Sequence, residues 1–375
     1  MKILLAGGGT GGHFYPLIAV ARSLKDIAER EKIVKLELIF ASDEPYDANL
    51  LREEEITFLK IPAGKFRRYF SILNFIDPFK TFWGILKALF AIYLNFPDVI
   101  FAKGGYASFP ALAAAKILRI PLLVHETDTV PGKVTLWASG FARRVAISFP
   151  QSVKYFPADK VALTGNPIRR EVLGGTAEEA RELFGLEPDL PLILALGGSQ
   201  GAQKLNDIVL DILPELVKFS QVAHQAGRGN FEAVRLRAGL ILENSSLAKR
   251  YNPYGFLDEE ELRSASRAAS LVVARAGGGS IFEIAAWGLP SILVPLPHAA
   301  QDHQRQNAYA YAREGAAEVL EEENLTPHVL LDRIQKLLGD KARREKMSQA
   351  AKAFAKPDAA EKIALEILKL ALEHS

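Results

Sequence analysis

The sequence has no cysteine among its 375 residues, which excludes disulfide bonds, thiolate metal sites and a cysteine nucleophile. Its charge is nearly balanced, with a formal net charge of +2 at pH 7, so we expect no nucleic acid as a partner. Long hydrophobic runs are also missing. The longest apolar stretch, residues 82–96, is shorter than the ~20 residues of a membrane-spanning helix, and Lys87 interrupts it. We therefore expect a soluble or peripheral membrane protein.

Short apolar runs alternate with amphipathic helical segments along the chain. This alternation indicates βαβ units and parallel sheets, and 375 residues are enough for two domains with full cores. Three helices are expected to end the chain, at about 326–338, 340–354 and 358–373. The expected strands are 2–6, 35–41, 57–61, 98–102, 121–125, 143–147, 191–196, 220–225, 252–256, 270–274, 290–294 and 316–320.

One local pattern occurs twice. Residues 3–13 read ILLAGGGTGGH and residues 192–202 read LILALGGSQGA, each an apolar strand that runs into a glycine loop and then a helix. Free N–H groups and the helix dipole make such a helix start an anion site. Two copies predict an α/β chain of two Rossmann-like, doubly wound domains. Only the first loop ends in a titratable side chain, His13, which is therefore a candidate catalytic group.

Turn and linker residues at 163–175 mark the expected domain boundary. We expect an N-terminal domain over residues 1–165 and a second domain over residues 166–345. The last helices, over residues 346–375, are expected to pack back on the N-terminal domain.

The first glycine loop also matches the dinucleotide fingerprint G-x-G-x-x-G through Gly7, Gly9 and Gly12. The acidic residue that should follow about 20 residues later is poorly placed, because Asp43 and Glu44 come about 30 residues after the loop. A dehydrogenase is therefore disfavoured.

A third glycine cluster, ARAGGGSIFEIAAWGLP, spans residues 274–290. Its glycines allow a close backbone approach, and Ser280 begins the following helix with its hydroxyl and N–H available to an anion. Glu283 lies one turn further and suits the vicinal diol of a ribose. A tight turn with a capping glutamate is the alternative, and the order of a diphosphate loop and a diol acceptor favours a nucleotide.

Two further groups of polar side chains follow expected strands. In each case binding to a ligand and a purely structural role remain open, although the carboxyl end of a parallel strand faces the ligand crevice. Amide and imidazole groups match the hydrogen-bonding needs of a sugar. The two groups are His125, Glu126, Thr127 and Asp128, and Asp302, His303, Gln304 and Asn307.

Residues 66–96 combine aromatic and aliphatic side chains with a rim of lysine and arginine. Such a stretch suits an anionic lipid surface. A core helix with snorkelling lysines is the alternative. The aromatic residues include Phe75, Phe79, Phe82 and Trp83, and the basic ones include Lys65, Lys80 and Lys87.

Taken together, seven blocks resemble the MurG family of glycosyltransferases. They occur in family order from residue 3 to about residue 320, which makes the match far more specific than any single glycine loop. The blocks are GGGTGGHFYPLIAVA, KGGYASFP, HETDTVPGK, TGNPIRREV, LGGSQGAQKLN, RAGGGSIFEIAAWGLP and the HQRQNA run.

The resemblance implies a GT-B fold, with the active site in the cleft between the two domains. It implies an inverting transfer of N-acetylglucosamine from UDP-N-acetylglucosamine to the C4 hydroxyl of the N-acetylmuramyl unit of lipid I, which forms lipid II for peptidoglycan. Such enzymes act at the cytoplasmic face of the cell membrane as peripheral proteins, without a cofactor or an obligatory metal. The sequence has no D-x-D triplet for a metal-bound diphosphate.

The resemblance also assigns roles by position. The donor residues would be Phe256 and Leu257 at the uracil, Glu283 at the ribose, Gly278, Gly279, Ser280, Ser199 and Arg169 at the diphosphate, and His303, Gln304 and Asn307 at the sugar. The acceptor residues would be Thr10, Gly11, Gly12, Tyr106 and Glu126, with His13 as the general base. Many members carry Gln-Asn where this chain has Thr127 and Asp128. An aspartate accepts hydrogen bonds but does not donate them, so Asp128 is both a candidate sugar contact and a rival candidate base.

Besides transfer to lipid I, two other functions remain open. A different GT-B transferase or a relative of the UDP-N-acetylglucosamine 2-epimerases would share the fold and the donor site. A nucleotide-sugar sensor would bind without turnover. The aromatic and basic stretch at 65–96 favours a lipid acceptor, and His13 with the polar groups at 125–128 favours catalysis.

Overall fold

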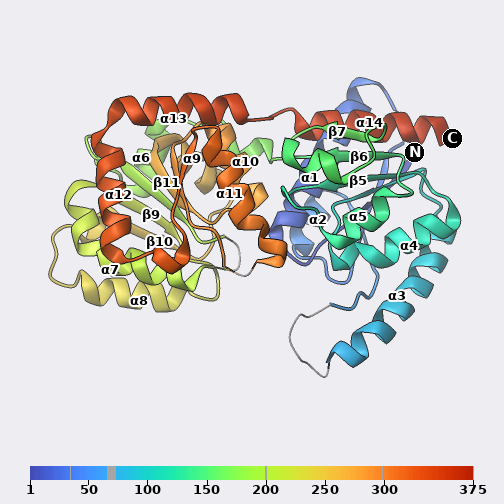
Figure 1. Cartoon of the computed structure of the whole chain (residues 1–375), viewed down its shortest axis with the longest axis horizontal. Helices are drawn as coiled ribbons and strands as arrows, with labels where there is room; N and C mark the ends of the chain where they lie inside the picture. The colour runs from blue at the N-terminus through green and yellow to red at the C-terminus, as the bar shows by residue number, and fades with distance from the viewer. Residues whose placement is uncertain (34, 66–72, 199–200, 298, 375) are drawn as a thin grey trace. The chain divides into compact units, whose positions relative to one another are not determined.

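The computed structural model describes residues 1–33, 35–65, 73–198, 201–297 and 299–374. The chain folds into two compact units (Figure 1). The first unit consists of Met1–Arg169 and Lys356–Ser375, and the second consists of Arg170–Ala355. The first passage between them lies within the turn-rich segment 163–175, and the chain returns at Lys356, next to Pro357.

The described part of the first unit contains a parallel sheet of seven strands in the order β3-β2-β1-β4-β5-β6-β7. Alternate residues of β1 enter different apolar clusters, so both faces of the sheet are covered. One face packs against α1 and α14, and the other against α3, α4 and α5 (Figure 1). The strands are β1 (Lys2–Ala6), β2 (Glu37–Ser42), β3 (Thr57–Lys60), β4 (Val99–Ala102), β5 (Leu122–Glu126), β6 (Arg144–Ile147) and β7 (Val161–Leu163). The helices are α1 (Gly11–Arg30), α2 (Ala48–Glu53), α3 (Leu73–Asn95), α4 (Phe109–Leu118), α5 (Lys133–Ser139) and α14 (Ala359–His374).

The described part of the second unit repeats this architecture with six parallel strands in the order β10-β9-β8-β11-β12-β13. Helices α7, α8 and α12 bury their apolar sides on one face of the sheet. The strands are β8 (Leu192–Leu196), β9 (Gln221–Gln225), β10 (Tyr251–Tyr254), β11 (Ala269–Ala274), β12 (Ser291–Leu293) and β13 (Ala317–Val319). The helices are α6 (Ala177–Phe184), α7 (Gln203–Phe219), α8 (Phe231–Ile241), α9 (Glu259–Ala268), α10 (Gly278–Trp287), α11 (His303–Arg313), α12 (Pro327–Gly339) and α13 (Lys341–Phe354).

The strand pattern predicted from the sequence is confirmed. Each predicted strand is present within two residues at either end, and the three terminal helices are α12, α13 and α14. The prediction missed β7, because this edge strand is only three residues long and its apolar run, Val161–Leu163, is shorter than the runs that predict a strand. Of the three terminal helices, α13 packs against α10 and α12 in the second unit, and only α14 packs against α1 in the first.

A buried imidazole joins β9 to its neighbours in the second unit. His224 is fully buried, its Nδ1 lies 2.8 Å from the hydroxyl of Tyr251, and its Nε2 lies 3.0 Å from Oδ1 of Asn206. The Asn206 amide nitrogen donates to the carbonyl of Ala226. Burial lowers the pKa of His224 to about 4, so the ring is neutral at physiological pH.

This histidine should make the second unit sensitive to acid. An unfolded chain binds a proton at His224 below about pH 6.5, whereas the native ring resists protonation until about pH 4. The free energy of unfolding should therefore fall by up to about 3 kcal/mol as the pH drops through that window. Urea unfolding at several pH values measures this free energy. The fluorescence of Trp287 reports on the second unit once Trp83 and Trp137 are replaced by phenylalanine. The control is His224→Gln, which should flatten the dependence; an equally steep curve for it would refute the assignment.

Candidate functional site in each unit

Strand register brings three loops of the first unit to one edge of its sheet. Ala6 at the end of β1 is in register with Ala102 at the end of β4, and Ala102 is in register with Val124 on β5. The segments that follow these strands therefore emerge side by side. They carry the first glycine loop, the Lys103 to Tyr106 segment and the polar residues 125–128.

The first glycine loop needs its glycines for conformation and for space. Gly8 and Gly9 have φ values of 132° and 83°, which side chains rarely adopt, and a Cβ on Gly9 would come within 3.0 Å of the Tyr106 ring. Thr10 then caps α1, and its carbonyl accepts the first helical hydrogen bonds. Gly11 is buried in the first turn and Gly12 is exposed. The loop thus presents the start of α1 at the sheet edge, as the sequence predicted.

His13 is held in a defined tautomer by the neighbouring strand. Its Nδ1 lies 3.2 Å from the carbonyl oxygen of Lys103. A carbonyl can only accept, so Nδ1 carries the hydrogen and Nε2 of the neutral ring carries the basic lone pair. The side chain is partly exposed, which leaves it accessible from solvent. This geometry is what a general base requires.

Tyr106 packs over the glycine loop among charged groups. Its hydroxyl donates to Oδ2 of Asp43 at 3.3 Å, and Nζ of Lys65 lies 5.2 Å from the ring centroid. Burial and the Asp43 carboxylate raise the pKa of Tyr106, so the phenol keeps its proton at neutral pH. The phenol therefore stays a donor, and in this structure its proton is directed at Asp43.

Glu126 organises the loop that contains Asp128. Its two carboxylate oxygens accept from the backbone N–H groups of Asp128 and Gly132, at 3.1 and 3.0 Å. Its side chain is buried, and burial with the nearby Asp128 carboxylate raises the pKa of Glu126 to about 7. Asp128 is only partly buried. Of these two acidic residues, Asp128 is the more accessible to a substrate, while Glu126 shapes the turn.

Lys103 is a site residue that the sequence analysis did not single out. It follows β4 directly and is fully buried, with Nζ within 2.7 Å of Nδ1 of His125. The only signal in the sequence was a lysine at the end of an apolar strand, inside the block KGGYASFP. A lysine in that position is usually solvent-exposed, so its burial had to come from the tertiary structure.

In the second unit, α10 starts immediately after β11 and a glycine turn. Gly277 is the N-cap, so the N–H groups of Gly278, Gly279 and Ser280 precede the first intrahelical hydrogen bond, which Ile281 makes to Gly277. Such a helix start binds an anion through its dipole and free N–H groups. Glu283 lies on the next turn and is partly exposed. The structure thus brings three of the predicted diphosphate residues, Gly278, Gly279 and Ser280, onto the same helix as the predicted ribose residue Glu283.

The predicted uracil residues follow β10. Phe256 stacks beneath the guanidinium of Arg228, whose Cζ lies 4.8 Å from the ring centroid. Leu257 is fully buried, and its N–H donates to Oε1 of Gln225 at 3.0 Å. A base contact through the backbone of Leu257 would therefore use its carbonyl oxygen.

The predicted sugar residues on α11 separate into two kinds. His303 and Gln304 are partly exposed; Nδ1 of His303 donates to the carbonyl of Ala300 at 2.7 Å, and Oε1 of Gln304 accepts from the N–H of Leu296 at 3.0 Å. Asn307 is fully buried, and its amide donates to the carbonyl of Ala276. Asn307 therefore ties α11 to the turn before α10.

Two of the predicted donor residues fall outside these groups. Ser199 lies outside the described residues. Arg169 belongs to the first unit, where its guanidinium lies 4.3 Å from the ring centroid of Tyr15 on α1, whereas the other described donor residues belong to the second unit.

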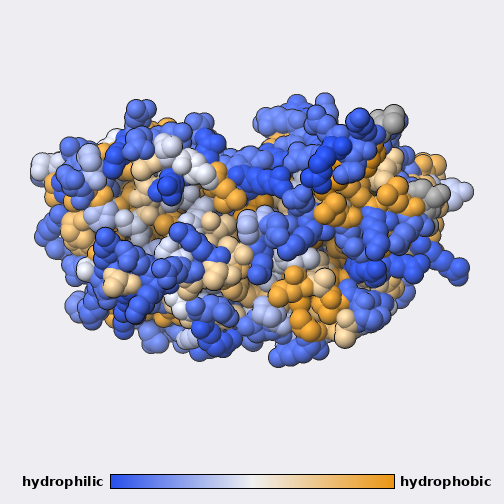
Figure 2. Space-filling model, turned by 90° about the horizontal axis from the view of Figure 1, so that it is seen from above, coloured by the Kyte–Doolittle hydropathy of each residue, from blue (hydrophilic) through white to orange (hydrophobic). Residues whose placement is uncertain are grey.

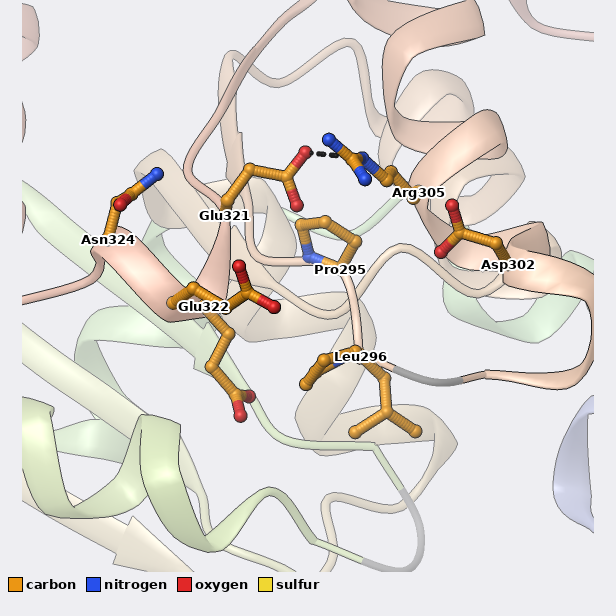
Figure 3. A pocket seen from close by; sticks show the side chains of 9 residues that line it. Pro295, Leu296, Asp302, Arg305, Glu321, Glu322 and Asn324 are labelled. Carbon is orange, nitrogen blue, oxygen red and sulfur yellow. Dashed lines mark ion pairs between the residues drawn. The ribbon is translucent and has the colours of Figure 1, made fainter.

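A cavity of about 320 Å³ lies beside the 295–305 segment of the second unit (Figure 3). Glu321 points toward Arg305, with 2.8 Å between Oε1 and Nε, and Glu322 pairs with Arg275. Acidic side chains dominate its lining, which disfavours a diphosphate there and leaves the start of α10 as the better anion site. No cluster of three or more His, Asp or Glu side chains suited to a metal occurs among the described residues.

Comparison with known proteins identifies the family. The N-terminal and C-terminal domains of glycosyltransferase family 28 match residues 3–147 and 192–363. The UDP-N-acetylglucosamine--N-acetylmuramyl-(pentapeptide) pyrophosphoryl-undecaprenol N-acetylglucosamine transferase of Treponema denticola is 37% identical, over 94% of this chain and 93% of its own. Its counterpart from Clostridium kluyveri is 36% identical, over 90% and 91% of the two chains. The chain belongs to the MurG family of glycosyltransferases.

Solved structures agree with this assignment. The crystal structure of MurG from Acinetobacter baumannii covers 98% of this chain and 99% of its own, with a TM-score of 0.73 and 26% identity. A putative UDP-N-acetylglucosamine 2-epimerase from Listeria monocytogenes, at 18% identity and a TM-score of 0.70, shares the fold alone. The two parallel-sheet units are thus the two Rossmann-like domains of a GT-B hexosyltransferase, as the sequence predicted.

Proposed function

We propose that this MurG-family chain transfers N-acetylglucosamine from UDP-N-acetylglucosamine to the C4 hydroxyl of the N-acetylmuramyl unit of lipid I, producing lipid II and UDP with inversion. The observation that carries the proposal is the match to named transferases over 94% of the chain. The two sites add chemical support. The first unit offers candidate bases for an acceptor hydroxyl, and the second offers a helix start for a leaving diphosphate.

The chemistry divides between the two units. The acceptor oxygen bonds to the anomeric carbon of the donor while the bond from that carbon to the diphosphate breaks, and its electron pair leaves with UDP. The N-terminal end of α10, with Ser280, stabilises the charge that builds on the diphosphate. The hydroxyl proton passes to a base in the first unit, and we assign that role to His13, with Asp128 as the rival.

The donor assignment rests on the order of groups along the second unit. A diphosphate at the start of α10 leaves the ribose diol near Glu283, one turn further along the same helix. Phe256 and Leu257 then serve the base, and His303 and Gln304 serve the sugar, while Asn307 holds the loop that carries the diphosphate site. In the first unit, Thr10, Gly11, Gly12 and Tyr106 serve the acceptor, with Glu126 shaping its loop.

Transfer to a soluble lipid I analogue, followed by product chromatography, tests the proposed function. The wild type should release UDP only when the acceptor is present. Glu283→Ala should weaken UDP binding by ~1–3 kcal/mol in titration calorimetry, because a charged hydrogen bond to the ribose is lost. Epimerised sugar without acceptor would assign an epimerase instead, and binding without turnover would assign a sensor. Unchanged UDP affinity in the variant would remove Glu283 from the donor site.

The two candidate bases can be separated by mutation. His13→Ala should lower kcat by roughly 10²–10⁴-fold with little change in the donor KM, because a general base acts on the chemical step. Asp128→Ala is the comparison variant. Abolished turnover in Asp128→Ala with near-normal kcat in His13→Ala would reverse the two roles.

The pH profile of the wild type alone would not decide this question. A free imidazole titrates near ~6.5 and a free carboxylate near ~4. However, burial raises the pKa of Glu126 to about 7, so an acid limb near neutrality would fit either His13 or Glu126. The two variants above are therefore the decisive comparison.

We also propose that α3 attaches the enzyme to the cytoplasmic face of the membrane as a peripheral protein, through an anionic lipid surface. One side of α3 exposes a stripe of aromatic and aliphatic residues, with Phe79 77% and Phe90 67% exposed, and Lys80 and Lys87 are exposed on the same helix. Exposed aromatics with lysines suit anionic lipid. The stripe comprises Phe75, Ile76, Phe79, Phe82, Trp83, Leu86, Phe90, Tyr93 and Leu94.

The opposite side of α3 is firmly packed. Ala88 and Ile92 are buried in the core, and a Cβ on Gly84 would clash with the carbonyl of Pro62, so helix and loop touch through their backbones. The face of the molecule drawn in Figure 2 is largely hydrophilic, and its orange, hydrophobic patches lie mainly on the side of the first unit. None of the described helices is long and apolar enough to cross a bilayer. The part of the stretch at 66–72 lies outside the described residues.

Vesicle sedimentation tests the lipid surface. Replacing Phe75, Phe79, Phe82 and Trp83 by serine should reduce binding to vesicles that contain phosphatidylglycerol, and high salt should weaken the wild type by screening the lysines. Leu236→Ser with Leu240→Ser is the matched control, because these α8 residues are 55% and 74% exposed but belong to the second unit. Equal binding of the wild type and the α3 variant would contradict the proposal.

A further inference from the structure

The ammonium group of Lys103 is buried among three acceptors from two other segments. Nζ lies 2.7 Å from Nδ1 of His125, 2.6 Å from Oγ1 of Thr127 and 2.9 Å from Oδ1 of Asn166. His125 and Thr127 belong to the end of β5 and the residue after it, and Asn166 follows β7. One side chain thus joins the ends of β4 and β5 to the 165–166 segment.

The hydrogen bonds around these acceptors determine what Lys103 can do. Nε2 of His125 donates to the carbonyl of Gly165 at 3.0 Å, so Nδ1 of the neutral ring must accept. The amide nitrogen of Asn166 donates to the carbonyl of Pro167, which turns its oxygen toward Lys103. Two of the three neighbours therefore only accept from Nζ, and the Thr127 hydroxyl can do so as well. An ammonium group has three hydrogens and satisfies all three.

Burial and the attraction of nearby carboxylates have opposite effects on the pKa of Lys103. Burial lowers the pKa of Lys103 to about 7, and the carboxylates of Glu126 and Asp128 act in the opposite direction. The other titratable neighbours are His125, which burial and Lys103 keep neutral by lowering its pKa, and His13, which bonds to the Lys103 carbonyl. Because such attraction is mutual, the ammonium also stabilises the negative charge of these carboxylates.

We propose that Lys103 is a positioning residue for glycosyl transfer, whose buried ammonium orders residues 125–128 and places a positive charge that attracts the carboxylates of Glu126 and Asp128. This inference rests on the proposed function, since it concerns the same acceptor-side residues. The backbone of Lys103 also contacts His13, the other candidate base, because the Lys103 carbonyl sets the tautomer of the His13 ring. A single residue thus arranges both groups that compete for the acceptor proton.

If Lys103 had only a structural role, the effect of replacing it on activity would be different. An apolar side chain of the same length could fill the space, and its lost hydrogen bonds would lower activity equally at every pH. The attraction between Lys103 and the carboxylates, by contrast, exists only while Lys103 is protonated. Since the pKa of Lys103 is about 7, its influence should be strong in mildly acidic solution and weak in alkaline solution.

The kinetic test compares Lys103→Met with the wild type across the pH range, using a soluble lipid I analogue. At about pH 6.5, kcat/KM should fall at least about tenfold, and the deficit should shrink severalfold by about pH 8.5. The affinity for UDP should stay within about twofold. Lys160→Met is the matched control and should behave as the wild type. Lys160 lies in the same unit, and among the bonds described its side chain donates only to the carbonyl of Gly140, at 3.4 Å. A deficit that is constant with pH would overturn the proposal.

A stability test needs no transferase activity, so it separates failure of this inference from failure of the proposed function. Thermal unfolding near pH 7 is compared for the wild type, Lys103→Met, Asp128→Asn and the double variant. The loss of Tm caused by Lys103→Met should be smaller when Asp128 is already neutral, because an amide needs no counter-charge. If Lys103→Met alone does not fold, folding of the double variant supports the proposal. Additive losses, or failure of both to fold, would contradict it.

Discussion

Parallel strand pairing in register is the constraint on which both candidate sites depend. In the first unit, Ala6, Ala102 and Val124 stand side by side across β1, β4 and β5, so the segments that follow them leave the sheet at one edge. In the second unit, Leu196 on β8 and Leu293 on β12 flank Ala274 on β11 in the same way. A slip of one residue would turn every side chain to the opposite face of the sheet and would separate the loops that carry the chemistry.

The glycine turns convert that register into ligand-binding surfaces. The turn before α1 needs glycine, because Gly8 and Gly9 adopt positive φ and Gly9 lies against the Tyr106 ring. The turn before α10 is built differently, since Gly277 has a φ of −66° and no atom lies within 4 Å of a Cβ added there. The side chains at the two helix starts also differ: α1 carries His13, whose Nδ1 bonds to the Lys103 carbonyl, whereas α10 carries Glu283 and follows the turn held by Asn307. This difference matches the acceptor role that we propose for the first unit and the donor role that we propose for the second.

Buried polar groups distinguish the two sheets more than their topology does. His224 lies among neutral partners and holds β9 against Tyr251 and α7, which is a structural use of an imidazole. His125 lies at an equivalent depth but accepts from a buried ammonium group next to two carboxylates. A low-dielectric interior strengthens interactions between charges, so the second arrangement couples the protonation of several groups. The polar network of the first unit is therefore the one to which we assign a positioning role in the proposed transfer.

The sequence by itself determined the fold class and the strand positions, because apolar periodicity and glycine turns are local signals that a linear chain retains. It indicated the family through the resemblance of seven motif blocks in order. It also located the helix start of α10 with Glu283 one turn later, since helix geometry converts spacing into proximity. The tertiary structure alone decided that Lys103 is buried, that Glu126 ties down its own loop and that Asn307 points inward. Burial and the partners of a polar group depend on which distant segments the sheet brings together, and no local pattern records that.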